Sequence, residues 1–260
     1  MIKGLRDIFS PFSSISPHSH LFPFSDKLNL GEDLKTDLHS HLIPCVDDGA
    51  QSMEESIEML KSFVKLGYSK VIITPHIMQD RYYNTHAKID EGLEKIRKEL
   101  VKESINIELE AAAEYYLDEE FEKLLYNKEL LTFGDNYVLF ETSFNNNPKK
   151  LFDLILEMQL AEYKPVLAHP ERYKYMHNNR DIYKKLKDYD VLFQIDLLSF
   201  TAYHSFDVQK TALWLCNNGM IDLVGSDAHK IEDLQSIEKL KSTSILKKVY
   251  EKNNLLNNML

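Results

Sequence analysis

The sequence predicts a single α/β domain in which seven strand–helix units form a closed or nearly closed barrel. From Lys35 onward, short apolar runs alternate with amphipathic helical patterns, which is typical of a parallel sheet covered by helices. Seven such units fit a barrel better than an open sheet. The sequence has no G-x-G-x-x-G and no Walker A pattern, so the two commonest nucleotide-binding interpretations lose support.

Composition narrows the functional class. The 260 residues suffice for one large domain, and the formal charge of −10 argues against a nucleic-acid backbone as the main partner. Two cysteines imply no disulfide framework, and no apolar run is long enough to insert into a membrane. We therefore expect a soluble, cytoplasmic protein.

Residues 1–34 are predicted to be an N-terminal extension, and residues 35–260 the functional domain. Proline interrupts any signal-peptide core, at Pro11, Pro17 and Pro23. The segment is nevertheless too apolar for a simple linker, so we expect it to pack on the domain or on a second copy, as in a homo-oligomer. His18 and His20 lie here with no strand before them, and we do not expect them to bind metal.

The elements follow from apolar periodicity, turn residues and capping signals. Ser52 and Glu55 form an S-x-x-E capping box before a helix whose apolar stripe ends near Gly67, a C-cap residue. Further helices are predicted at 85–103, 118–126, 148–162 (with Pro148 at its start), 181–189, 206–217 and 231–250. Strands are predicted at 35–38, 71–74, 107–112, 137–140, 165–168, 191–195 and 221–224.

Ionisable side chains gather at or just past the carboxyl ends of these strands. His39 and His41 follow the first strand, and residues i and i+2 of an extended chain point to the same side. The other members of the set are His76, Glu114, Glu141, His169, Asp227 and His229, so that five of the ten histidines fall at these ends. In a barrel all these ends meet on one face. Burying so many ionisable groups together without a metal ion would be costly.

The ligand chemistry favours a catalytic metal site. Nitrogen and oxygen ligands without a thiolate argue for manganese, iron or zinc in a catalytic centre and against a structural cysteine-type zinc site. Cys45 is interpreted as a small apolar filler. A cysteine-based phosphatase needs a C-x5-R loop, and neither Cys45 nor Cys216 is followed by an arginine at that spacing.

Six segments carry a resemblance to a known family: TDLHSHLIPCVDDGA, VIITPH, AAAEYY, LFET, VLAHPERY and VGSDAHK. Together they resemble the motifs of the PHP (polymerase and histidinol phosphatase) superfamily over about residues 35–250. More closely, they are similar to the manganese-dependent tyrosine phosphatases encoded in bacterial capsule and exopolysaccharide gene clusters. The resemblance implies a distorted (β/α)7 TIM-like barrel, the PHP fold, as a single domain.

The resemblance also implies three divalent metal ions, with manganese first and iron or zinc as alternatives. Glu114 would bridge the first two ions and, with Asp227 and Arg172, belong to the catalytic groups. The implied ligands are His39, His41, Glu114 and Asp227 for the first ion, Glu114, Glu141 and His169 for the second, and Asp48, His76 and His229 for the third. Asp47 is the less favoured member of the aspartate pair. Four carboxylates against three divalent ions leave about two positive charges, which suits a phosphate dianion attacked by a metal-bound hydroxide.

Arg172, in H-P-E-R-Y, would bind the substrate phosphate. One feature departs from the family pattern, because KIEDLQSIEK after S-D-A-H lacks the second arginine that such phosphatases usually carry. Lys230 and Arg81 are the nearby cations, and Tyr82, Tyr83 and Asn84 are expected at the mouth of the site.

The function expected from this resemblance is hydrolysis of phosphotyrosine, with the tail of a bacterial tyrosine kinase that controls capsule or exopolysaccharide synthesis as the expected partner. Two alternatives stay open. One is a small-molecule phosphomonoesterase such as histidinol-phosphate phosphatase, which shares the metal site. The other is a non-catalytic, metal-binding regulatory domain, which the intact ligand set argues against.

Overall fold

The structure, a computed structural model, describes residues 34–260, so the predicted extension lies outside the described residues except for Leu34. Within residues 34–260 all paired strands are parallel, as predicted. One sheet has the order β1-β2-β4 and the other β3-β5-β6-β7-β8-β9. The strands are β1 Thr36–Asp37, β2 Lys70–Ile73, β3 His76–Ile77, β4 Glu108–Ala111, β5 Glu114–Tyr116, β6 Tyr137–Glu141, β7 Lys164–Ala168, β8 Leu192–Asp196 and β9 Leu223–Gly225.

Two of the seven predicted strands each lead, after a bend, into a second short strand beyond their predicted ends. The strands before the bends belong to one sheet and those after the bends to the other. β2 leads into β3 across Pro75, which has no N–H to donate, and β4 leads into β5. Backbone hydrogen bonds continue across the bends, from Ala112 N to Ile73 O at 2.9 Å and from Glu114 N to Pro75 O at 3.0 Å. Counting each bent strand once leaves seven strand positions, as expected, although β3 and β5 are not predicted from the sequence.

The first and last strand positions meet beyond β1 and β9. A parallel bridge joins Ser40 to Ala228, and Asp227 N donates to His39 O at 2.8 Å. Below it, the buried carboxylate of Asp37 accepts hydrogen bonds from Ser226 N at 2.8 Å and from Ser226 Oγ at 3.0 Å. The ring is therefore joined by one bridge and these hydrogen bonds and not by a continuous ladder.

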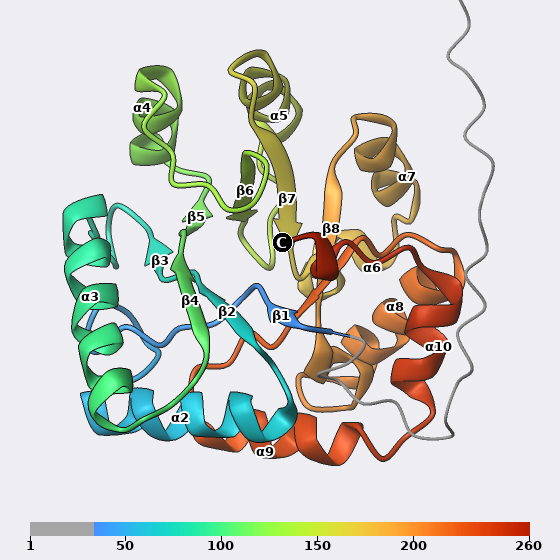
Figure 1. Ribbon diagram of the computed structural model, residues 1–260. Helices are drawn as coiled ribbons and strands as arrows, with labels where there is room; N and C mark the ends of the chain where they lie inside the picture. The colour runs from blue at the N-terminus through green and yellow to red at the C-terminus, as the bar shows by residue number, and fades with distance from the viewer. Residues whose placement is uncertain (1–33) are drawn as a thin grey trace, which may run out of the picture.

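Helices surround the strands, and α2 and α9 lie side by side along one edge (Figure 1). Ser52 caps α2 by accepting from Glu55 N, and Gly67 ends it in the left-handed conformation with a φ of 98°. The Glu55 carboxylate reaches back to Gln51 N, one residue before the position that a capping box requires. The helices are α2 Met53–Leu66, α3 His86–Lys102, α4 Glu119–Asn127, α5 Leu151–Leu160, α6 Lys174–His177, α7 Asp181–Asp188, α8 Phe206–Asn217, α9 Ile231–Leu240 and α10 Ile245–Lys252, with short 3-10 turns η1 Pro170–Arg172, η2 Leu197–Phe200 and η3 Asn257–Met259.

Two helix predictions are wrong. Pro148 does not begin α5, because the chain turns first and the helix starts at Leu151. The predicted helix 231–250 is divided into α9 and α10. At the break, Ser242 Oγ donates to Lys239 O and Thr243 Oγ1 to Leu240 O, both at 2.7 Å. Such short hydroxyl side chains satisfy the last carbonyls of a helix and compete with its continuation.

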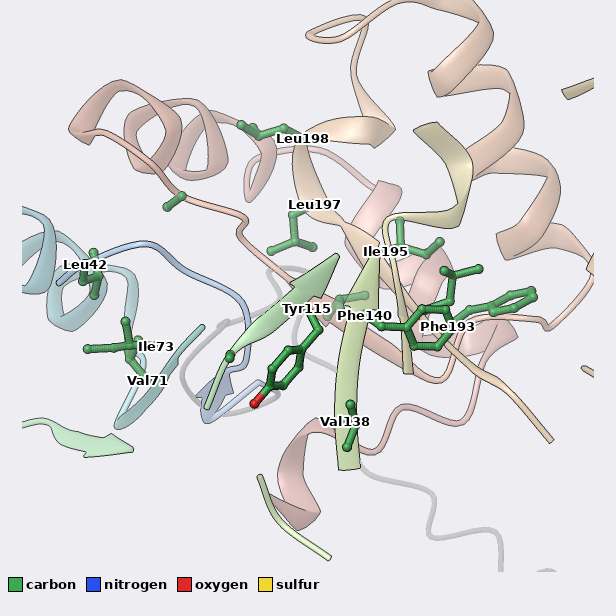
Figure 2. Packing of buried hydrophobic residues seen from close by; sticks show 14 of the residues in the cluster. Leu42, Val71, Ile73, Tyr115, Val138, Phe140, Phe193, Ile195, Leu197 and Leu198 are labelled. Atoms are coloured by element: carbon green, nitrogen blue, oxygen red, sulfur yellow. The ribbon is translucent and has the colours of Figure 1, made fainter. Parts of the chain in front are cut away.

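Alternate residues of the strands pack on opposite faces. Ile72, Leu139 and Val166 belong to a small buried cluster that fills the inner face of the ring. Their neighbours, such as Ile73 and Phe140, belong to the large cluster between strands and helices (Figure 2). This period of two is what the apolar runs predict for strands buried on both faces. No helix within residues 34–260 combines the length and apolarity needed to cross a bilayer.

The contact between Asp37 and Ser226 generates a prediction about stability. Ser226→Ala leaves a buried carboxylate oxygen without its hydroxyl donor, which costs about 1–3 kcal/mol of unfolding free energy. Urea denaturation of chelator-treated protein measures the loss. Ser244→Ala, at an exposed position whose side chain makes no capping hydrogen bond, serves as the control and should change stability by less than about 0.5 kcal/mol. Equal stability of the two variants would show that Asp37 and Ser226 do not hold the ring together.

Candidate metal centre

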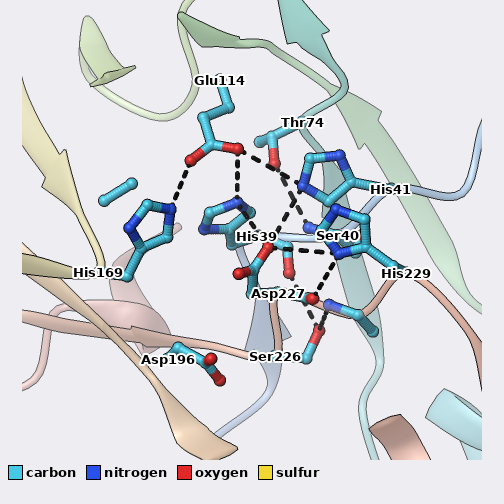
Figure 3. A network of polar contacts seen from close by, with 12 residues as sticks. His39, Ser40, His41, Thr74, Glu114, His169, Asp196, Ser226, Asp227 and His229 are labelled. Atoms are coloured by element: carbon cyan, nitrogen blue, oxygen red, sulfur yellow. Dashed lines mark hydrogen bonds and ion pairs between the residues drawn. The ribbon is translucent and has the colours of Figure 1, made fainter. Parts of the chain in front are cut away.

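Eight predicted ligands converge on one end of the ring, and the ninth, Asp48, lies at their edge. His39 and His41 follow β1, and their imidazoles lie beside Glu114 of β5 and Asp227 after β9 (Figure 3). Strand pairing sets part of the cluster directly, because His76 and Glu114 are register partners in β3 and β5. The carboxyl ends of parallel strands thus bring together residues that are far apart in the sequence, as the barrel prediction requires.

The innermost group consists of His39, His41, Glu114 and Asp227. Their ligand atoms lie within 4.8 Å of one another, and all four residues are buried. His39 Nε2 is 3.1 Å from Glu114 Oε2 and 3.2 Å from Asp227 Oδ1. Within the described residues, His39 Nε2, His41 Nε2, Glu114 Oε2 and Asp227 Oδ1 are buried without a hydrogen-bond partner. Burying unpartnered polar atoms is costly, and a divalent cation bound by all four would satisfy them.

Two outer residues orient these imidazoles. His39 Nδ1 donates to Gln194 Oε1 at 2.8 Å, and the Gln194 amide is itself fixed by donating to Ile195 O at 2.9 Å. His41 Nδ1 donates to Asp47 Oδ2 at 2.8 Å. In both histidines the Nε2 atom is left for a metal ion, an arrangement common around metal-bound imidazoles. Asp47 therefore orients a predicted ligand through its side chain.

Glu114 links the innermost group to a second one. His76 Nδ1 lies 3.1 Å from Glu114 Oε2 and 3.4 Å from Glu141 Oε1, so His76, Glu114 and Glu141 form a compact group. His169 Nε2 lies 2.8 Å from Glu114 Oε1 and 4.0 Å from Glu141 Oε2. The two oxygens of Glu114 face different neighbours, as the predicted bridging role requires.

The third group surrounds His229. Its Nδ1 donates to Asp227 O at 2.9 Å, and its Nε2 lies 3.6 Å from Asp48 Oδ1. His76 Nε2 lies 3.5 Å from the same Asp48 oxygen. His76 thus presents one nitrogen to each of two groups, whereas the family pattern assigns it only to the third. Asp48 is the most open predicted ligand, with a side chain 46% exposed.

The cluster is electrostatically strained in the absence of a cation. Burial disfavours the imidazolium forms of His39 and His76, but adjacent carboxylates, Glu114 first, outweigh it and raise both pKa values to about 10. Burial and the charge of Glu114 raise the pKa of Glu141 to about 8. The His229 pKa rises to about 9, because contacts with Asp48 and Asp227 outweigh its burial. In the metal-free site, protons on these side chains therefore supply the positive charge that a bound metal ion would otherwise supply.

Two glycines let the backbone pass close to the predicted ligands His41 and His39. A Cβ at Gly49 would lie 2.1 Å from His41 O, and one at Gly225 would lie 2.7 Å from His39 Cβ. Gly49 is thus required by space, not by a left-handed turn. His169 and Asp227 adopt left-handed φ values of 33° and 49°, where non-glycine residues are uncommon and backbone strain is often associated with functional sites.

Arg172 lies beside the cluster, as predicted. Its Nη1 donates to Asp227 Oδ2 at 2.5 Å, and its guanidinium lies 4.7 Å from the centre of the Phe144 ring. Burial disfavours the charged guanidinium of Arg172, but Asp227 and neighbouring carboxylates outweigh this effect. They raise the Arg172 pKa above its ordinary value, so the group stays cationic. Arg172 and the ligands line a cleft of about 330 Å³, here called the metal cleft.

The rim of the metal cleft is aromatic and partly unforeseen. Tyr82 lines it and stacks on His76 at 5.3 Å between ring centres, as expected for a mouth residue. Tyr83 is 63% exposed and does not line the cleft, and Asn84 is buried and braces the backbone by donating to Val46 O and His76 O. Cys45 is exposed, so its interpretation as an apolar filler is wrong.

Sequence reasoning did not find Gln194, Tyr116 or Phe144. Tyr116 and Phe144 line the cleft, and each follows a predicted ligand by two or three residues, namely Glu114 and Glu141. Their position just past a ligand is a signal that the sequence does contain. Gln194 lies within β8, and nothing in its apolar surroundings marks it as a partner of His39.

Known proteins resemble this chain over most of its length. The family described as capsular polysaccharide synthesis, CpsB/CapC, matches residues 35–257. The chain is 32% identical to the tyrosine-protein phosphatase YwqE of Bacillus subtilis over 197 residues, covering 75% of this chain and 78% of that protein. It is 28% identical to the putative tyrosine-protein phosphatase CapC of Staphylococcus aureus, covering 83% and 85%, and 26% identical to CpsB of Streptococcus pneumoniae, covering 75% and 83%.

Solved structures show the same fold. A crystal structure from the study of YwqE and CpsB, described as unique metal-dependent tyrosine phosphatases, superposes with a TM-score of 0.73 at 29% identity and covers 84% of this chain and 90% of that chain. A histidinol phosphate phosphatase from Lactococcus lactis reaches a TM-score of 0.52 at 12% identity, covering 82% and 93%, and shares the fold alone. Because this family model matches nearly all of the described residues, the chain belongs to the CpsB/CapC family of capsular polysaccharide synthesis.

Proposed function

We propose that this protein is a metal-dependent tyrosine-protein phosphatase whose catalytic domain spans residues 35–260. The observation that carries the proposal is the convergence of unpartnered ligand atoms from His39, His41, Glu114 and Asp227 beside the buried cation of Arg172. Relatives named as tyrosine-protein phosphatases support the choice of substrate class. A non-catalytic role would not require a cationic side chain next to a complete ligand set.

The proposed ligands are the nine predicted residues, arranged for three ions with manganese as the first choice. When bound, the ions would activate water and neutralise the phosphoryl oxygens. We propose that a tyrosine kinase that controls capsule or exopolysaccharide synthesis is the partner and that the enzyme works in the cytoplasm. Homo-oligomer formation stays a prediction, because the apolar segment behind it lies outside the described residues.

The side chains of the protein have separate tasks in this proposal. Gln194 and Asp47 hold the imidazoles of His39 and His41, and Glu114 and Asp227 keep negative charge where the ions bind. Arg172 offers further N–H groups to a phosphoryl oxygen, since only Nη1 is engaged by Asp227. A planar guanidinium suits phosphate better than a lysine ammonium. The rings of Tyr82, Tyr116 and Phe144 provide an apolar rim for a phenyl group.

The activity test uses a phosphotyrosine peptide. We expect the purified protein to release phosphate from it, to be stimulated by Mn²⁺ and to lose activity with a chelator, because the proposed nucleophile is a water that the bound ions would activate. Cys45→Ser is the control and should keep the wild-type rate. Chelator-resistant turnover would refute the metal mechanism, and a strong preference for histidinol phosphate would replace the proposed substrate class.

Metal affinity should rise with pH. His39 and His76 have pKa values near 10, and His229 near 9, so ions must displace protons from the metal-free site below those values. Calorimetric titration with Mn²⁺ between pH 6 and pH 9, in buffers of different ionisation enthalpy, measures affinity and proton release together. Glu114→Gln should weaken binding at every pH, whereas Glu157→Gln, on the exposed face of α5, should not. Affinity independent of pH would contradict the proposed ligands.

Arg172→Ala should lower kcat/KM for a phosphotyrosine peptide by about a hundredfold, the loss of a charge-assisted contact in a shielded site. Arg172→Lys should recover only part of this, because a point charge cannot donate in a planar fork. Arg81→Ala, at the rim, should cost less than either. Steady-state kinetics with metal content measured in parallel decides the matter, and a near-normal Arg172→Ala enzyme with full metal content would place the phosphate elsewhere.

A further inference from the structure

A second cavity adjoins the metal cleft. It has a volume of about 250 Å³ and is here called the side cavity. Arg172, Asp227 and His229 line both spaces, so the guanidinium of Arg172 lies at their boundary. The remaining polar lining comes from two other places in the chain, namely the end of β8 with the turn after η2, and the first turn of α9: Asp196, Tyr203, His204, Lys230 and Asp233.

The carboxylates of the side cavity are already engaged. Asp196 is 1% exposed, and its oxygens accept from Leu198 N at 2.8 Å and contact His204 Nε2. Asp233 is 5% exposed and accepts from Tyr203 Oη at 2.6 Å and from the backbone N–H of His229 and Lys230 at 3.0 and 3.1 Å. Asp227 is engaged by Arg172 and by the ligand group. These acceptors have little capacity left for a cationic ligand.

The donors, in contrast, are open. The Lys230 side chain is exposed, and its ammonium makes no ion pair or hydrogen bond with the part of the chain that the structure describes. Arg172 has N–H groups beyond the one given to Asp227. A cavity with open donors and engaged acceptors fits an anion with exposed oxygens.

The position of the side cavity limits the source of that anion. Tyr203 at its edge is 46% exposed, so the cavity opens to solvent on one side and reaches Arg172 on the other. A substrate whose phosphoryl group contacts Arg172 from the metal cleft would carry its neighbouring residues over this opening. The ammonium of Lys230, which the phosphoryl group does not use, has three N–H donors for the oxygens of a carboxylate.

We propose that the side cavity is a recognition subsite for the carboxylate of an acidic side chain next to the phosphotyrosine, with the ammonium of Lys230 as its donor. This inference rests on the proposed function and deepens it. The chain has a formal charge of −10, so the protein as a whole repels an acidic peptide electrostatically. Local donors at the site would be needed to select it.

The experiment compares two phosphotyrosine peptides that differ only in flanking Glu or Gln residues. Wild-type enzyme should prefer the acidic peptide by about tenfold in kcat/KM, through KM, the size of one charge-assisted contact. Lys230→Gln keeps the length of the side chain without its charge and should reduce this ratio to about two or less. Lys230→Arg should restore it, and Lys98→Gln, on the exposed face of α3, should leave it unchanged.

Fluorescence anisotropy of the same labelled peptides with chelator-treated enzyme measures the preference independently of turnover. Hydrolysis of both peptides at equal kcat/KM by wild-type enzyme would overturn the subsite while leaving the phosphatase proposal intact. Equal losses on both peptides in Lys230→Gln would overturn it as well. Absence of hydrolysis of either peptide would refute the proposed function, and the anisotropy ratio would still decide whether the side cavity selects a carboxylate.

Discussion

The candidate metal centre depends on the contact between the residues just after β1 and those just after β9. His39 and His41 follow the first strand, whereas Asp227 and His229 follow the last, and only the contacts at this seam bring the two pairs together. Asp37 is buried here, and its burial raises the carboxyl pKa to about 7 even though Ser226 donates to both of its oxygens. The seam therefore contains a polar group that is costly to bury, and the hydrogen bonds of Ser226 offset that cost.

The proposed ligands are also buried polar groups, but their inner atoms have no hydrogen-bond partner within the described residues. Around His39 and His41 every outer nitrogen has a partner, Gln194 or Asp47, while the inner Nε2 atoms have none in the described structure. A network satisfied on the outside and unsatisfied at its centre is costly unless a cation binds there. The apolar inner cluster beneath, with Ile72, Leu139 and Val166, holds the ligand-bearing strand ends in place. The site is thus preorganised by the fold, at an electrostatic cost that metal binding would relieve.

The sequence allowed the parallel α/β fold to be predicted because short apolar runs alternate with amphipathic helical patterns from Lys35 onward. The H-x-H after β1 and the S-D-x-H after β9 are local patterns, and seven alternating units place them on one face. Features decided by tertiary contacts were not predicted. The bends that create β3 and β5, the selection of Gln194 as the partner of His39, and the two-sided placement of His76 depend on neighbouring strands. The break between α9 and α10 was missed because hydroxyl caps inside a periodic stretch resemble ordinary polar residues.

Arg172 lies between the metal cleft and the side cavity and lines both. It is held by Asp227, itself a proposed ligand, so its position depends on the same seam that assembles the metal centre. On one side it faces the aromatic rim of the metal cleft, and on the other it faces Lys230 and His204. Asp233 connects these two sides, because one of its oxygens holds the backbone of His229 while the other holds Tyr203. A single buried carboxylate thus holds both the backbone of a proposed ligand and the turn that carries Tyr203, so the walls of the two spaces share one hydrogen-bond acceptor.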